Sequence, residues 1–212
     1  MERNKKFVII DYGMGNLRSV LNAFVFLGLD AAISNRREDM FRADAIVLPG
    51  VGAFGEAVSN LNRLGIRDSL DKRVLEDKVP YLGICLGMQL VSNGSEEGGY
   101  HRGFGWISGE TVRIPVAGST RLPHIGWNDI KILKKEPLFE SVNTDMNFYF
   151  VHSFFVDCDP EYISAVCSYD VEITAALQKD NIFATQFHPE RSQENGLRVL
   201  RAFANFTEGY DA

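Results

Sequence analysis

The segment YLGICLGMQ, residues 81–89, passes from a strand pattern to a helix pattern at a cysteine. Its first half is a short apolar run of the kind that forms a buried strand, and its second half begins a helix that we expect over residues 86–92. Cys85 lies at the junction, between Gly83 and Gly87. This order of residues is typical of a nucleophile elbow, a tight strand-to-helix turn that presents a reactive side chain above the edge of a sheet.

The position of Cys85 favours a reactive thiol. The partial positive charge of a helix N-terminus favours thiolate over thiol, and the free amide N–H of Leu86 can face a developing oxyanion. A buried structural cysteine between two packing glycines is the competing interpretation of this motif on its own. Other parts of the chain have to decide between the two.

Apolar runs and helical spacings alternate along the first part of the chain. Strands are predicted at Phe7–Ile10 and Ala45–Leu48, and amphipathic helices at Asn16–Leu27 and, with a break near Gly65, at Phe54–Glu76. Strands that alternate with helices pair in parallel. This part of the sequence therefore predicts a doubly wound sheet.

Beyond Gly94 the sequence becomes glycine-rich and then β-prone, which suits an antiparallel extension of the sheet. The β-prone runs are Thr111–Ile114, Asn147–Val156, Ser164–Ser168, Ile173–Gln178 and Phe183–Phe187. A final helix is predicted over Gly196–Phe206. We therefore predict an α/β fold of three layers, with a mostly parallel central sheet, in one domain over residues 1–212.

Composition disfavours several classes of protein. The formal net charge is -6 and the basic residues are scattered, which disfavours nucleic-acid and anionic-membrane binding. No apolar run approaches the roughly 20 residues that span a bilayer, and no signal-peptide pattern opens the chain, so we expect a cytoplasmic protein. Cys85, Cys158 and Cys167 form neither a CxxC pair nor an even disulfide set, which fits a reducing compartment.

Neither a metal nor a nucleotide cofactor is expected. The histidines show no local metal-ligand spacing, although clustering in space stays open. They are His101, His124, His152 and His188. The loop DYGMGN at 11–16 looks like a dinucleotide-binding loop, but Arg18 occupies the third glycine position and no phosphate-binding lysine follows.

A histidine and a carboxylate lie two residues apart at the end of the last β-prone run, in QFHPE at 186–190. On an extended chain such residues project to the same side, so His188 and Glu190 can cooperate, and Pro189 helps to hold that geometry. A thiol nucleophile needs a base, and a carboxylate fixes the imidazole tautomer. Alone, a strand-end histidine near a solvated glutamate is the plainer interpretation, but the cysteine elbow and the Pro-Gly strand end at 49–50 together favour a catalytic set.

With these motifs the chain resembles the class I glutamine amidotransferases, which cut the side-chain amide of glutamine with a Cys-His-Glu triad. The resemblance covers nearly the whole chain and rests on GICLGMQ at 83–89 and FHPE at 187–190. It implies a flavodoxin-like fold, glutamine as the substrate, and catalytic roles for Cys85, His188 and Glu190.

The resemblance also assigns two groups of binding residues. The oxyanion hole is implied at Val51, Gly52 and Leu86. The ligands of glutamine are implied at Gln89 and Glu97 and in the backbone around His152, Ser153 and Phe154. Plainer interpretations stay open for Glu97 as a solvated loop charge and for His152 as a satisfied strand histidine.

Within the family, PGVGAF at 49–54 and PHIGWN at 123–128 resemble glutaminases of histidine biosynthesis, which pass ammonia to a cyclase partner built as a (β/α)8 barrel. A heterodimer is implied, with Asn16, Trp127 and Arg191 facing the partner. Many relatives have lysine at the last of these positions. Arginine keeps the charge and changes the hydrogen-bond geometry.

Three alternative functions stay open at this point. A paralogous pair of proteins could supply ammonia for amidation of a surface-polysaccharide sugar. A cysteine peptidase or chaperone-like protein could share the elbow, although Gln89 and the carboxylate partner argue against it. A non-catalytic regulatory role is disfavoured because all three triad positions are filled.

Overall fold

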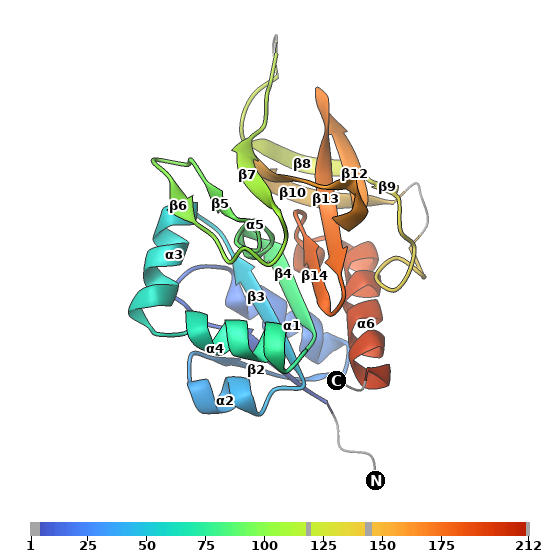
Figure 1. Ribbon diagram of the computed structural model, residues 1–212. Coiled ribbons are helices and arrows are strands. Elements are labelled where there is room, and N and C mark those ends of the chain that lie inside the picture. Colours follow the sequence, from blue (N-terminus) through green and yellow to red (C-terminus); the bar gives the residue numbers. More distant parts are fainter. Residues whose placement is uncertain (1–4, 118–119, 143–145, 211–212) are drawn as a thin grey trace.

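The computed structural model describes residues 5–117, 120–142 and 146–210, and its centre is an eight-stranded sheet (Figure 1). In spatial order the strands are β2 (Asp30–Ser34), β1 (Lys6–Ile10), β3 (Ala45–Gly50), β4 (Tyr81–Cys85), β14 (Ile182–Thr185), β13 (Val171–Lys179), β12 (Ile163–Tyr169) and β9 (Lys131–Ile132). Neighbours from β2 to β14 pair in parallel, and those from β14 to β9 pair antiparallel. The predicted α/β class with an antiparallel extension is confirmed.

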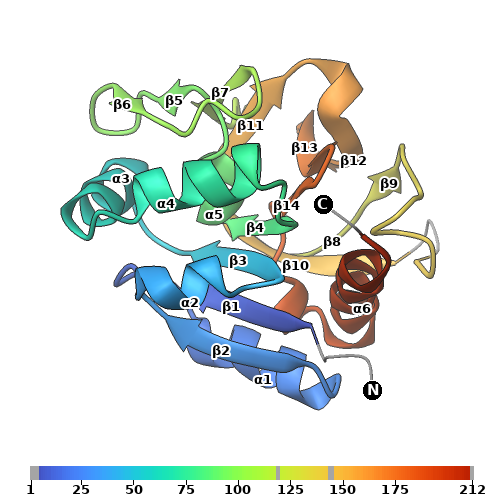
Figure 2. The same cartoon turned by 60° about the horizontal axis from the view of Figure 1, so that its bottom comes forward.

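Helices cover both faces of this sheet, as Figure 2 shows. They are α1 (Leu17–Phe26), α2 (Arg37–Phe41), α3 (Phe54–Arg63), α4 (Arg67–Asp71), the π-helical turn η1 (Lys72–Glu76) and α6 (Gln193–Gly209). Strand residues alternate between the faces, so that Phe7 and Ile9 pack with α1 and α6, and Val8 and Ile10 pack with α3 and α4. Three layers and two hydrophobic clusters result.

The limits of helix α1 follow from its sequence. Asn16 is the N-cap of α1, and its side chain accepts a hydrogen bond from the amide of Ser19 at 3.4 Å. Val20 and Phe24, four residues apart, are buried against the sheet. Gly28 has a φ of +75°, a conformation that ends a helix readily, so the predicted boundaries are close to the observed ones.

Two smaller sheets lie beside the central one. A two-stranded antiparallel sheet pairs β8 (His124–Asp129) with β10 (Asn147–His152), and a four-stranded sheet has the order β11 (Phe154–Cys158), β7 (Gly109–Arg113), β5 (Gly94–Ser95) and β6 (His101–Arg102). The prediction of one continuous strand over 147–156 was wrong, because the chain breaks at Ser153 and passes from one small sheet to the other. A 3-10 turn, η2 (Pro160–Tyr162), then leads into β12.

The helix after the elbow is shorter than predicted. It is α5 (Leu86–Gln89), and residues 90–92 leave the helix. The carbonyl of Leu90 accepts a hydrogen bond from the amide of Phe104 at 2.7 Å, and the carbonyl of Val91 accepts one from the amide of Trp106 at 2.9 Å. These bonds to the following loop replace further helical turns.

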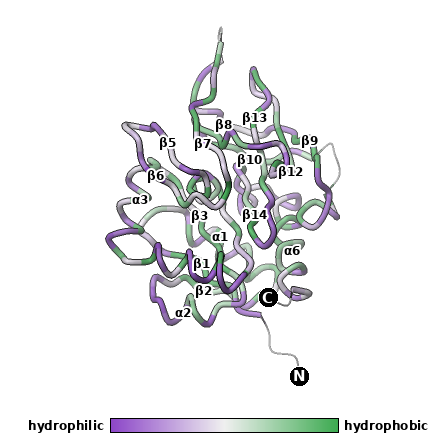
Figure 3. Tube along the Cα trace, in the orientation of Figure 1, coloured by the Kyte–Doolittle hydropathy of each residue, from purple (hydrophilic) through white to green (hydrophobic). Residues whose placement is uncertain are grey.

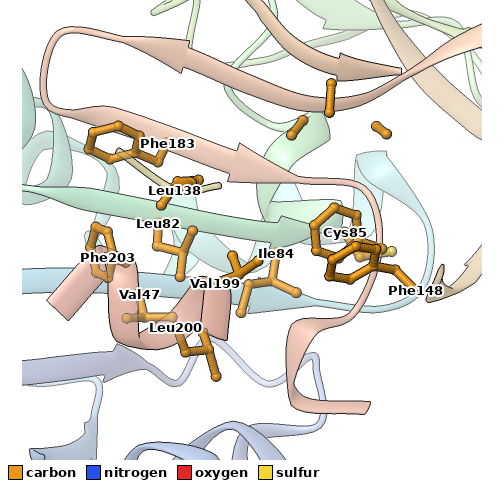
Figure 4. Packing of buried hydrophobic residues seen from close by; sticks show 14 of the residues in the cluster. Val47, Leu82, Ile84, Cys85, Leu138, Phe148, Phe183, Val199, Leu200 and Phe203 are labelled. Carbon is orange, nitrogen blue, oxygen red and sulfur yellow. The ribbon is translucent and has the colours of Figure 1, made fainter. Parts of the chain in front are cut away.

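Cys85 lies at the end of a hydrophobic cluster. In Figure 3 the central strands are largely hydrophobic, whereas hydrophilic residues gather on the outer turns. In Figure 4 Cys85 lies at the carboxyl end of β4 beside Phe148, at one end of the buried cluster that also contains Leu82 and Ile84. Within the described ranges no helix is long and apolar enough to cross a membrane.

Candidate active site

The turn at Cys85 has the geometry of a nucleophile elbow. Cys85 has φ 54° and ψ −106°, a conformation that costs a non-glycine residue on the order of 1–3 kcal/mol. A Cβ at Gly83 would lie 2.5 Å from the carbonyl oxygen of Gly87, and a Cβ at Gly87 would lie 1.8 Å from the carbonyl oxygen of Leu48. The two glycines therefore allow the backbone contacts that hold the strained cysteine.

The N–H of Leu86 begins α5, where no intrahelical acceptor exists for it. Because α5 has 4 residues, its dipole contributes less charge at the thiol than the predicted helix over 86–92 would. The larger contribution of α5 to the site is the free N–H of Leu86, which lies beside the carboxyl end of β4. Gly50, the last residue of β3, is paired in register with Cys85.

His188 and Glu190 form a buried pair at the next parallel strand end. Nδ1 of His188 lies 2.8 Å from Oε1 of Glu190, and their side chains are 4% and 1% exposed. The expected extended geometry was wrong, because residues Pro189–Arg191 form the 3-10 turn η3. Proline suits the first position of such a turn, and the turn brings the carboxylate back to the imidazole.

The pKa of His188 reflects both of its neighbours. Burial acts to lower this pKa, but the charge and hydrogen bonding of Cys85 and then of Glu190 outweigh it and raise the pKa to about 10. Nε2 of His188 has no hydrogen-bond partner of regular geometry among the described residues, and Cys85 is the neighbouring acid. The structure thus brings together the three residues predicted as a triad.

A cavity of about 320 Å³ opens at Cys85. Its lining contains Cys85 and every oxyanion-hole and substrate residue implied by the resemblance: Val51, Gly52, Leu86, Gln89, Glu97, His152, Ser153 and Phe154. Gly52 has φ +111°, which glycine adopts without strain, so the backbone at Val51 and Gly52 has freedom to change its direction. The volume suits one small molecule rather than a polymer.

Two side chains in the wall have defined orientations. Oε2 of Glu97 accepts a hydrogen bond from the amide of Phe54 at 2.8 Å, at the start of α3, so Glu97 is not a free solvated charge. Nε2 of Gln89 donates to the carbonyl oxygen of Phe154 at 2.9 Å and to Oε1 of Gln186 at 3.2 Å. Both carboxamide hydrogens of Gln89 are used, which leaves its oxygen as an acceptor.

His152 lines the cavity, and its ring belongs to a chain of hydrogen bonds. Nδ1 lies 2.9 Å from the carbonyl oxygen of Phe154, and Nε2 lies 3.0 Å from Nδ1 of His124. Burial lowers the pKa of His124 to about 4 and is the largest cause that lowers the pKa of His152 to about 3, so both rings are neutral. The plainer interpretation of the His152 side chain therefore fits the structure.

Three histidines gather in space, although the sequence separates them. His188 acts electrostatically on His152, which in turn bonds to His124. Across the parts of the chain that the structure describes, no group of three or more His, Cys, Asp or Glu side chains could hold a metal ion.

Sequence reasoning missed Pro123, Val151 and Gln186. Pro123 and Val151 line the cavity, and Sγ of Cys85 lies 3.9 Å from the carbonyl oxygen of Val151. Gln186 contacts both Cys85 and Gln89 from a fully buried position. Its place two residues before His188 was the available signal, because alternate residues of a strand share a side.

The residues expected to face a partner are exposed. Trp127 is 45% exposed and contacts the edge of Tyr149, with ring centroids 6.1 Å apart. The guanidinium carbon of Arg191 lies 4.2 Å from the centroid of the same tyrosine ring. Asn16 is exposed at the start of α1, which contacts η3. The backbone carbonyl of Tyr149 also accepts a 2.9 Å hydrogen bond from the amide of His188.

The chain is similar to known proteins over most of its length. A family model described as glutamine amidotransferase class-I matches residues 8–205. Imidazole glycerol phosphate synthase subunit HisH 1 of Campylobacter jejuni is 48% identical over 196 residues, 92% of this chain and 98% of that relative. Imidazole glycerol phosphate synthase subunit HisH 2 of Methanococcus maripaludis is 43% identical over 196 residues, 92% of this chain and 96% of that relative.

Solved structures share the architecture. The structure of PurLQS from Thermotoga maritima has a TM-score of 0.75 against this structure, at 18% sequence identity, and the match covers 96% of this chain and 99% of that one. At this level of identity the likeness concerns the fold alone.

Proposed function

Since the chain belongs to the class I glutamine amidotransferase family, we infer that it is an enzyme that hydrolyses the side-chain amide of glutamine and delivers the ammonia to a second protein. The observation that carries this proposal is the buried Cys85–His188–Glu190 arrangement at the cavity, in which Cys85 and Glu190 raise the pKa of His188 against the effect of burial. An imidazolium beside a cysteine favours the thiolate, which is the reactive form.

In the first step Sγ of Cys85 attacks the γ-carbonyl carbon of glutamine. The carbonyl oxygen takes up the electron pair of the C=O bond, and the amides of Leu86 and of Val51 or Gly52 stabilise it. The Leu86 amide is directed by the elbow, whereas the 51–52 backbone has glycine on both sides of Val51. A tetrahedral intermediate with a new C–S bond results.

In the second step the C–N bond breaks. His188 gives its proton to the leaving nitrogen, which departs as ammonia, and a γ-glutamyl thioester remains on Cys85. Water then attacks the thioester, His188 takes a proton from that water, and glutamate leaves. Glu190 holds the imidazole so that Nε2 faces the reacting atoms throughout.

Different groups of the protein bind the α-ammonium group and the α-carboxylate of glutamine. The oxygen of the Gln89 carboxamide and the carboxylate of Glu97 accept hydrogen bonds from the α-ammonium group of the substrate. Backbone around His152, Ser153 and Phe154 binds its α-carboxylate. We place the whole reaction in one glutaminase domain over residues 1–212 of a cytoplasmic protein.

The acceptor of the ammonia is a cyclase with a (β/α)8 barrel, in an imidazole glycerol phosphate synthase of histidine biosynthesis. The names of the relatives at 43–48% identity support this pathway over amidation of a polysaccharide sugar. Asn16, Trp127 and Arg191 are the residues of this chain that contact the barrel. Their exposure, and the packing of Trp127 and Arg191 on Tyr149, support a common surface.

The test of the proposal is the Cys85→Ala variant, purified with the cyclase. We expect glutamine-dependent synthesis to be lost while synthesis from added ammonium salts continues at the wild-type rate. Loss of both activities would indicate a structural role for Cys85, and wild-type glutamine-dependent activity in the variant would overturn the proposal.

A genetic experiment separates the two pathways. Expression of this chain together with its cyclase should restore growth of a histidine auxotroph that lacks both native proteins. Growth that still requires histidine, although the purified pair releases ammonia from glutamine, would favour the polysaccharide pathway instead.

A further inference from the structure

Gln186 is a fully buried amide at the centre of the site, between the end of β14 and His188. Its backbone amide donates to the carbonyl oxygen of Ala175 at 2.8 Å, which anchors the residue to β13. Its side-chain Nε2 lies 3.6 Å from Sγ of Cys85, and its Oε1 accepts from Gln89 at 3.2 Å. A buried carboxamide is stable only where its polar atoms have partners, and here the partners belong to the reaction centre.

One backbone carbonyl fixes the direction of these hydrogen bonds. The carbonyl oxygen of Phe154 can only accept, so the Gln89 atom 2.9 Å away is its NH2 group. The same NH2 group then donates to Gln186, whose contact atom is therefore its oxygen. The remaining end of the Gln186 carboxamide is an NH2 group directed at Cys85. Rotation of either carboxamide by 180° would place like atoms in contact.

We propose that Gln186 is a further catalytic residue, which donates a hydrogen bond to the nucleophilic sulfur of Cys85 and holds the oxygen of Gln89 toward the substrate. The donor stabilises the thiolate more than the thiol, because a hydrogen bond to an ionised acceptor is roughly twice as strong as one to a neutral acceptor. The part of this inference that concerns Gln89 rests on glutamine as the substrate.

The two contacts of Gln186 serve different steps. The bond to Sγ acts on the free protein, before any substrate binds. The bond to Gln89 acts on substrate binding, since it engages the second hydrogen of the Gln89 NH2 group, beside the one that Phe154 accepts, and so restricts the carboxamide further. Loss of Gln186 should therefore have two effects, a change in the reactivity of Cys85 and a change in the KM for glutamine. Each effect can be measured separately.

The experiment uses Gln186→Met, which keeps much of the volume and removes both the donor and the acceptor. The rate of alkylation of Cys85 by iodoacetamide is measured against pH, in the full chain without glutamine and without the partner, with modified sites assigned by mass spectrometry. We expect the midpoint of the profile to move to higher pH and the rate at neutral pH to fall about 10- to 100-fold.

The other cysteines supply an internal control. Burial is the largest cause that raises the pKa of Cys158 to about 12, and burial raises the pKa of Cys167 to about 12. At pH values well below these pKa values both side chains stay thiols, so the alkylation of Cys85 can be followed alone.

A matched variant separates the proposal from a general loss of stability. Asn181 is also a buried amide, and its Nδ2 donates to the carbonyl oxygens of Val74 at 3.0 Å and Val79 at 2.8 Å, away from the cavity. Asn181→Leu should lower the melting temperature and leave the alkylation profile as in the wild type. A wild-type profile in Gln186→Met, or an equal shift in Asn181→Leu, would overturn the proposal.

Glutaminase assays with the cyclase test the second contact. We expect Gln186→Met to lower kcat/KM about 100-fold, with a rise in KM that Asn181→Leu does not show. An unchanged KM in Gln186→Met would overturn the role toward Gln89. A shifted alkylation profile in a chain whose wild type releases no ammonia from glutamine would support the bond to sulfur and overturn the proposed function.

Discussion

At the scale of single residues, the chemistry of this site depends on where one proton resides. His188 is buried, and burial by itself lowers the pKa of an imidazole, yet Cys85 and Glu190 raise this pKa to about 10. The ring therefore carries two N–H groups at neutral pH, with Nδ1 directed to Glu190 at 2.8 Å. In the proposed mechanism, the proton needed by the leaving ammonia is thus on the imidazole before the substrate arrives.

The variant Glu190→Gln tests the part of the carboxylate in this arrangement. Glutamine keeps the shape but removes a charge that raises the pKa of His188, so the imidazolium will lose its proton at lower pH. We expect kcat/KM for glutamine to fall by about 100-fold or more at pH 8, with its alkaline limb moved to lower pH. The measurement is glutamate release against pH, in complex with the cyclase.

The matched control for that variant is Glu194→Gln. Glu194 lies in the first turn of α6 and pairs with Arg198 at 2.6 Å on the surface, with its side chain 77% exposed. The pH profile of this control should equal that of the wild type. A Glu190→Gln profile with no displaced limb would contradict the role given to the carboxylate.

The backbone of Cys85 leads to a prediction about stability. At φ 54° and ψ −106° a side chain is strained and glycine is not. We expect Cys85→Gly to have a free energy of unfolding about 1 kcal/mol higher than Cys85→Ala, as measured by urea denaturation. Inside a helix, glycine should instead be less stable than alanine, so Ala23→Gly in α1 should lower the free energy of unfolding. Equal stability of the two Cys85 variants would show that the turn relaxes.

The sequence predicted the three side chains that the structure brings together at this site because their signals are local. The elbow around Cys85 and the short motif from His188 to Glu190 each lie within a few residues. The role of Gln186 was not predicted, because its partners, Cys85 and Gln89, are far from it in sequence. They contact Gln186 only when β14 pairs with β4.

At the scale of elements, the elbow depends on how closely β3, β4 and α5 approach one another. Gly87 lies against the carbonyl oxygen of Leu48 in β3, and Gly83 lies against the backbone of Gly87. No side chain fits between these backbones, so the turn and the sheet edge form one rigid support for the nucleophile.

Gly87→Ala should therefore damage both stability and activity. The new Cβ would lie 1.8 Å from the carbonyl oxygen of Leu48, so β3 and α5 have to separate. We expect a loss of about 1–3 kcal/mol or more in the free energy of unfolding, measured by urea denaturation. In Gly209→Ala, at the end of α6, a Cβ meets nothing within 4 Å, and stability should be unchanged or slightly higher.

Element boundaries were predictable where periodicity was strong. Helix α1 has apolar residues at regular spacing between an N-cap and a glycine, and its limits were close to the prediction. Strands β2 and β8 were not predicted; β8 is HIGWND, which has a buried histidine and no continuous apolar face. The break at Ser153 also has no turn signal in the sequence, because it arises from pairing with two different sheets.

At the scale of the whole molecule, the buried neutral histidines link folding to pH. Burial lowers the pKa of His124 to about 4 and is the main cause that lowers that of His152 to about 3, whereas an unfolded chain has values near 6.5. Between pH 6.5 and about 4 the unfolded state therefore binds up to two protons that the folded state does not. Their contribution to stability is present above pH 6.5 and is lost as the pH falls toward 4.

We therefore expect the free energy of unfolding to fall with a slope of up to about 2.7 kcal/mol per pH unit between pH 6 and pH 4. Urea denaturation at a series of pH values measures this slope. His124→Gln removes one of the two protons, so its slope should be about half as steep. The same slope in this variant and in the wild type would show that these rings titrate freely in the folded protein.

The arrangement of the three sheets has a mechanical consequence for the assembled enzyme. The strand that carries His152 pairs with the strand of exposed Trp127, and the next strand, which begins at Phe154, belongs to the other small sheet. His152, Ser153 and Phe154 all line the cavity. If the proposed partner binds β8 at Trp127, we expect the backbone at Ser153, between β10 and β11, to move with β10, the strand that pairs with β8. Partner binding and glutamine binding would then be coupled through the main chain of His152, Ser153 and Phe154, which lines the cavity.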